Sequence, residues 1–64
     1  MYEYEITALV RAREGGTKVR KLKAKFSKPK DRWSMTDYDI LERYLGRRKD
    51  VQGDVSIMEV EEIK

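Results

Sequence analysis

The chain of 64 residues has no cysteine and no histidine, and it has only one proline, one tryptophan and one phenylalanine. The lack of cysteine excludes disulfide bonds and thiolate metal sites, and the lack of histidine excludes Ser–His and Cys–His nucleophile pairs. A chain this short buries only about 60% of the surface that its unfolded form exposes, so its stability margin is thin. We therefore expect a domain without catalytic activity, cofactor or metal.

Long apolar segments are also missing. The longest uninterrupted apolar run is Ala8-Leu9-Val10, far shorter than the roughly 20 residues of a membrane-spanning helix. The first five residues do not form a basic stretch followed by an apolar one, so we expect no signal peptide. With the absence of cysteine, these features favour a cytoplasmic protein that has no membrane partner.

Charge, in contrast, is abundant and unevenly distributed. Residues 11–32 contain ten lysines and arginines against Glu14 and Asp31, which gives this segment a net charge of +8. The remaining residues carry a net charge of −5, and the whole chain +3. A small protein polarised in this way usually meets a charged partner with its concentrated end.

The first 26 residues alternate in the manner of a β-hairpin. Apolar residues occupy the even positions of residues 2–13, and Leu22, Ala24 and Phe26 continue this pattern in residues 17–26. Period two is typical of half-buried strands. A three-residue loop, Glu14-Gly15-Gly16, suits a bulged hairpin with glycine at its third position.

This loop predicts a register for the two strands. It places apolar residues opposite one another on the inner face, with Tyr4 opposite Phe26, and it places Glu5 opposite Lys25 on the outer face. A two-residue loop would instead set buried positions opposite lysines.

Residues 37–46 are expected to form the only helix. Thr36 is a suitable N-cap, and Met35 with Ile40 fits a hydrophobic staple around it. Gly46 marks the expected end of the helix. The apolar stripe of this helix is expected to contain Ile40, Leu41, Tyr44 and Leu45, with Tyr38 at its flank.

Residues 54–63 are expected to form a third strand. Val55 and Ile57 share one face and Met58 and Val60 the other, so either a bulge lies near Met58 or both faces are partly covered. The fold class is α+β: a single ββαβ domain over residues 1–64, with strands at about 2–13, 17–26 and 54–63. We expect a three-stranded antiparallel sheet in the order 2-1-3 with the helix on one face. The alternative places strand three parallel to strand two, in the order 1-2-3.

Three sets of residues are candidates for partner binding. The basic set lies at the hairpin tip and in the connector that follows it, and Trp33 adjoins it. These residues are Arg11, Arg13, Lys18, Arg20, Lys28, Lys30, Arg32 and Trp33. Such a patch binds phosphate backbones, but lysines also protect an edge strand from aggregation. Trp33 either stacks on a base or anchors a protein interface, or it covers the core of the domain. Leu9 and Val19, on the outer face of the hairpin, are candidates for a protein interface.

Two hypotheses about function follow. The size, the element order and the dense charge resemble those of small phage-encoded or mobile-element accessory proteins, which implies a factor that binds and modulates a host protein. This resemblance identifies no site residue. The alternative is a nucleic-acid-binding module that uses the basic hairpin of residues 11–32. A homodimer through strand edges is compatible with both hypotheses.

Overall fold

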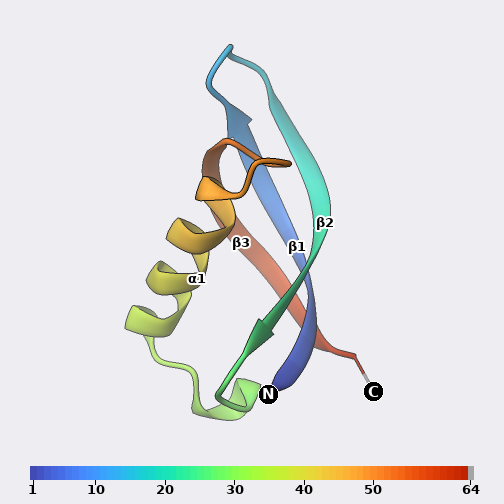
Figure 1. The fold of residues 1–64 in the computed structure, drawn as a ribbon, viewed down its shortest axis with the longest axis vertical. Coiled ribbons are helices and arrows are strands. Elements are labelled where there is room, and N and C mark those ends of the chain that lie inside the picture. Colours follow the sequence, from blue (N-terminus) through green and yellow to red (C-terminus); the bar gives the residue numbers. More distant parts are fainter. Residues whose placement is uncertain (64) are drawn as a thin grey trace.

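The computed structural model describes residues 1–63, which form three strands, one α-helix and one short 3₁₀ helix (Figure 1). In chain order these are β1 (Tyr2–Ala12), β2 (Thr17–Phe26), η1 (Lys30–Arg32), α1 (Met35–Arg47) and β3 (Gly53–Glu62). The strands form one antiparallel sheet in the order β2-β1-β3, and α1 packs on one face of it. The predicted fold class and strand order are confirmed, and the parallel alternative is excluded.

The register predicted for the hairpin was wrong by two residues. Tyr4 lies opposite Ala24 instead of Phe26, and Glu5 lies opposite Lys23 instead of Lys25. A shift of two residues keeps every side chain on its own face, because side chains alternate with period two. The alternation in the sequence therefore placed each residue on the correct face but did not determine its partner.

The hairpin loop explains this shift. The turn contains Arg13, Glu14 and Gly15, and Ala12 closes it by donating its N–H to the carbonyl of Gly16 and accepting from the N–H of Gly15, both at 3.1 Å. Gly15 has a φ of 90°, in the left-handed region that glycine adopts without strain. The loop is thus of the predicted three-residue type, but it begins and ends one residue earlier.

Strand β3 contains a bulge at Met58. Thr7 of β1 pairs with Glu59 and Ala8 pairs with Ile57, so Met58 is an extra residue without a partner. The sequence left open whether a bulge or a double-sided strand explains the slipped pattern, and the structure has the bulge. Its effect is to bring Val60 onto the same buried face as Val55.

Helix α1 begins two residues before the predicted start. Ser34, not Thr36, is the N-cap: its side chain accepts from the N–H of Asp37, while the Asp37 side chain accepts from the Ser34 N–H. This reciprocal arrangement is a capping box. The predicted staple was also wrong, because Met35 and Ile40 are both exposed.

Only part of the predicted apolar stripe of α1 faces the sheet. Leu41 and Leu45 are buried, and Tyr38 packs against the core. Ile40 and Tyr44, which were predicted to belong to the same stripe, are 51% and 56% exposed. The buried positions follow a narrow stripe, so the neighbouring apolar side chains lie on the solvent side of the helix.

Gly46 lies within the helix instead of ending it, since α1 continues to Arg47 and Arg48 is the C-cap. The reason for glycine here is the close approach of the next strand. A Cβ at position 46 would lie 2.5 Å from the carbonyl oxygen of Gly53, at the start of β3. That backbone oxygen belongs to a paired strand, so it has little freedom to move away.

We predict that Gly46→Ala lowers stability, although alanine is favoured over glycine by about 1 kcal/mol in a helix interior. The steric conflict with β3 should outweigh that gain and give a net loss of roughly 1–2 kcal/mol. Urea denaturation followed by circular dichroism measures it. Thr36→Ala, an exposed position of the same helix, serves as the control. A rise in the unfolding midpoint of Gly46→Ala would contradict the predicted role of the close contact.

Candidate protein-interaction surface

The sheet face opposite α1 is uncovered in the part of the chain that the structure describes (Figure 1). Its residues lie in rows across the three strands, and the bulge at Met58 falls between the second and third rows. From β2 through β1 to β3, successive rows are Lys23-Glu5-Glu61, Lys21-Thr7-Glu59 and Val19-Leu9-Ser56. We call these nine residues the open face.

Positive and negative side chains of the open face lie on different strands. Its β2 side carries Lys21 and Lys23, and its β3 side carries Glu59 and Glu61. Glu5, in the central strand, lies between Lys23 and Glu61. Opposite charges thus form two parallel columns about two strand spacings, or roughly 10 Å, apart. A partner that fits this face must present acidic groups over β2 and basic groups over β3.

Leu9 and Val19 form the apolar part of the open face. They are a direct cross-strand pair, and their exposed fractions are 39% and 59%. The sequence proposed these two residues as a protein interface, and the structure brings them side by side. Exposed apolar residues are common singly, but here two of them lie together in the last row of the open face.

The strand edges are less available than this face. At the β2 edge, the guanidinium of Arg48 donates to the carbonyl of Lys23 at 2.7 Å. At the β3 edge, the carboxylate of Glu42 accepts from the N–H of Ile57 at 2.9 Å. Side chains from α1 and from the residue after it therefore occupy backbone groups that an added strand would need.

The basic candidate residues do not form one surface. Arg11, Arg13 and Lys18 are exposed at or near the hairpin tip. Lys30 and Arg32 are exposed in η1, at the other end of the 34 Å long axis (Figure 1). The segment that is continuous in sequence is thus divided between two distant ends of the molecule.

Arg20 has an intramolecular role. Its guanidinium donates to the backbone carbonyl of Asp50 at 2.9 Å, which ties the loop after α1 to β2. In the same loop, Arg48 forms a two-point ion pair with the Asp50 carboxylate at 3.1 and 3.0 Å. The hydrogen bonds from Arg48 lower the pKa of Asp50 below its ordinary value.

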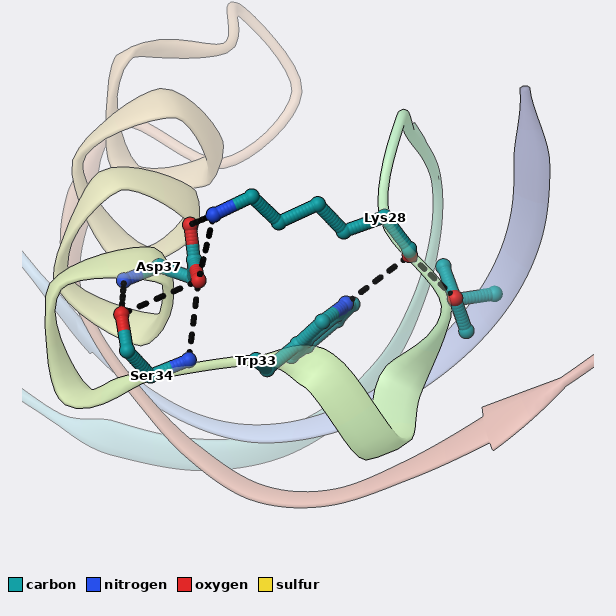
Figure 2. Close-up of polar contacts among 5 residues, drawn as sticks. Lys28, Trp33, Ser34 and Asp37 are labelled. Atoms are coloured by element: carbon teal, nitrogen blue, oxygen red, sulfur yellow. Dashed lines mark hydrogen bonds and ion pairs between the residues drawn. The ribbon is translucent and has the colours of Figure 1, made fainter.

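Lys28 is also engaged within the molecule (Figure 2). Its ammonium lies 3.2 Å from both oxygens of the buried Asp37 carboxylate. Asp37 also accepts from the backbone N–H of Ser34 at 2.8 Å and from its hydroxyl at 3.0 Å. The backbone hydrogen bond from Ser34 is the main cause that lowers the pKa of Asp37, and the hydroxyl and Lys28 add to it.

Trp33 covers the end of the core. Its ring makes edge-to-face contacts with Tyr4, Phe26 and Tyr38, with centroids 4.9–5.3 Å apart. Its indole N–H donates to the carbonyl of Lys28 at 3.0 Å (Figure 2). The hydroxyl of Tyr4 donates to the same carbonyl. Burial raises the pKa of Tyr4, which keeps this hydroxyl protonated as a donor. These contacts match the covering role of Trp33, one of the two that the sequence left open.

Comparison with protein-family models, curated proteins and solved structures gives no match to this chain. Within residues 1–63, no helix has the length and apolar character to cross a membrane. The same residues contain no group of three acidic side chains placed to hold a metal ion. The interpretation of function therefore depends on the surfaces of the molecule.

We predict that Asp37→Asn destabilises the protein at pH 7 and makes its stability less sensitive to acid. Because the pKa of Asp37 is lower in the folded state than its ordinary value of 3.8, the unfolded chain binds its proton more readily. The contribution of ionised Asp37 is complete above about pH 4 and is lost as the pH falls towards its folded pKa. Urea denaturation at pH 7 and pH 3 should show a smaller difference for the variant than for the wild type.

Asp39→Asn is the matched control, since Asp39 is an exposed acid of the same helix. Its effect at pH 7 should remain within about 0.5 kcal/mol. Equal free energies of unfolding for Asp37→Asn and Asp39→Asn at pH 7 would show that the capping box does not stabilise the protein.

We predict that Trp33→Ala reduces the free energy of unfolding by about 3 kcal/mol, because it removes the largest side chain of the aromatic cluster. Trp33→Phe keeps much of the packing and loses the hydrogen bond to Lys28, at a cost of about 1 kcal/mol. Thermal unfolding followed by circular dichroism compares the two variants. Full stability of Trp33→Ala would show that the ring is a free surface group and not a cover for the core.

Proposed function

We propose that the chain is a small non-enzymatic module that binds another protein through the open face. The observation that carries this proposal is the uncovered sheet face, with Leu9 and Val19 together and oppositely charged columns beside them. A sheet with one exposed side normally carries alternating polar residues there. An apolar cross-strand pair beside a divided charge pattern is a specific surface, which a complementary protein can recognise.

The nucleic-acid alternative has weaker support. Of the seven basic candidates, Arg20 and Lys28 make contacts within the chain, and the others lie at two distant ends. The lysines of β2 share their face with Glu5, Glu59 and Glu61. Phosphate binding needs a continuous basic track, and this face lacks one.

In keeping with the proposal, we propose that the protein acts in the cytoplasm, as a modulator of a host protein.

The proposal predicts that Leu9→Thr/Val19→Thr abolishes retention of a partner protein while the fold is kept. Threonine preserves strand propensity and removes much of the apolar contact. The measurement is affinity capture from a nuclease-treated lysate of the source cells, with wild type and variant as parallel baits. One stoichiometric protein should be retained by the wild type and lost from the variant.

The matched control is Lys30→Thr/Arg32→Thr, in η1 and away from the open face. It should retain the same partner. If the partner binds both variants equally, the open face is not the docking surface. If the wild type retains no protein but binds duplex or single-stranded DNA in low salt, the nucleic-acid alternative replaces the proposal.

A further inference from the structure

The solvent side of α1 carries a second surface that the open face does not include. Ile40, Arg43, Tyr44 and Arg47 have the spacing i, i+3, i+4, i+7, which places them on one stripe of the helix. All four are exposed. We call this stripe the α1 ridge. Helix α1 packs on the sheet face opposite the open face (Figure 1), so the ridge and the open face belong to different sides of the sheet. Tyr44 also borders the sheet, since it lines a groove with Ala24 and Lys25 of β2.

The two sides of the ridge differ in charge. On one side, Arg43 and Arg47 border a groove that also contains the acids Asp39, Glu42 and Asp54. On the other side, an open groove is lined by Ile40, Arg43, Tyr44, Arg47, Arg48 and Lys49, without an acidic residue. Arg48 is neutralised by Asp50. Among residues 1–63, no ion pair involves Arg43, Arg47 or Lys49. Three cations thus surround two exposed apolar side chains.

Helix electrostatics explain only part of this arrangement. Basic residues in the last turn stabilise the C-terminal end of a helix, and Arg47 lies there. That effect is confined to the last turn and does not account for Arg43 or for the exposure of Ile40 and Tyr44. Tyrosine and arginine are enriched at protein interfaces and at their energetic centres.

We propose that the α1 ridge binds an acidic segment of a partner protein, with an apolar side chain of that segment against Ile40 and Tyr44. Arg43 and Arg47 are one turn apart, which separates them by about 6 Å along the helix axis. Two carboxylates at i and i+4 of a partner helix have the same spacing, so each arginine can meet one carboxylate. This site is independent of the open face, and the molecule can therefore bridge two partners.

A protein segment fits the ridge better than a nucleic acid or a lipid surface does. Phosphate groups can pair with the arginines, but a phosphate backbone has no apolar group for Ile40. Insertion into a bilayer needs a broad apolar face with several large side chains, and the ridge offers two. The mixture of cations and apolar groups is best matched by carboxylates placed beside an apolar side chain.

The test uses a synthetic helical peptide of sixteen residues, built from alanine with glutamates at i and i+4 and one leucine beside them. Titration into ¹⁵N-labelled protein should shift the amide signals of residues 40–49 and leave those of Leu9 and Val19 on the open face unchanged. Arg43→Glu/Arg47→Glu should weaken binding at least tenfold, and Tyr44→Ala about fivefold. Replacing the glutamates of the peptide with glutamines should abolish binding.

Lys30→Glu/Arg32→Glu is the matched control, because it changes the net charge equally at a distant place. It should weaken binding less than threefold. Equal losses in both double variants would show attraction by net charge alone and would overturn the proposal. So would binding of a twelve-nucleotide oligothymidylate, or of phosphatidylserine vesicles, to residues 40–49 without binding of the peptide. Circular dichroism confirms that each variant is folded, and Leu9→Thr/Val19→Thr should bind the peptide normally.

Discussion

One helix of thirteen residues is the only layer that covers three strands in the described chain, and the rest of the structure depends on this limit. A helix buries one stripe, and a sheet buries the face against which that helix lies. The result is a core of mostly small and medium side chains, completed at one end by Trp33. One sheet face and the outer side of α1 have no covering layer in the described chain. Both candidate surfaces follow from the size of the chain.

The same limit explains where the charged residues are used. A sheet of three strands has two edges, and one helix cannot cover both with its backbone. Arg48 and Glu42 extend from the helical side to backbone groups of β2 and β3. Lys28 fixes the segment between β2 and α1 by its contact with Asp37. Arg20 fixes the loop after α1 by its hydrogen bond to the carbonyl of Asp50. Part of the dense charge therefore substitutes for the missing secondary structure, so the number of basic residues overstates the charge that a partner can meet.

The fold could be predicted because alternation and capping signals are local. The period-two pattern placed Ile6 and Leu22 on the buried face, and it does so in either register, which is why the register itself could not be determined. The helix start was misplaced because Ser34 and Thr36 are both good caps. Each has an aspartate three residues later, Asp37 and Asp39, so the spacing does not choose between them. In the structure, Asp37 completes the capping box with Ser34 and also contacts Lys28. The partner of Lys28 could not be predicted for another reason. Its contact with Asp37 depends on the path of the chain between β2 and α1, which no local sequence signal determines.

The candidate surfaces were predictable to different degrees. Leu9 and Val19 could be proposed because parity places both on the outer face, and both registers leave them there. The α1 ridge was missed because Ile40 and Tyr44 were assigned to the apolar stripe by hydrophobicity. The signal that could have found it is the area available: a helix on three strands buries one narrow stripe, and Leu41 with Leu45 already fills it. The next stripe, with two arginines beside Ile40 and Tyr44, must then face solvent. Nine large apolar side chains are exposed in the described chain, so exposure by itself does not mark a binding surface. What distinguishes Ile40 and Tyr44 is that Arg43 and Arg47 lie on the same stripe of the helix.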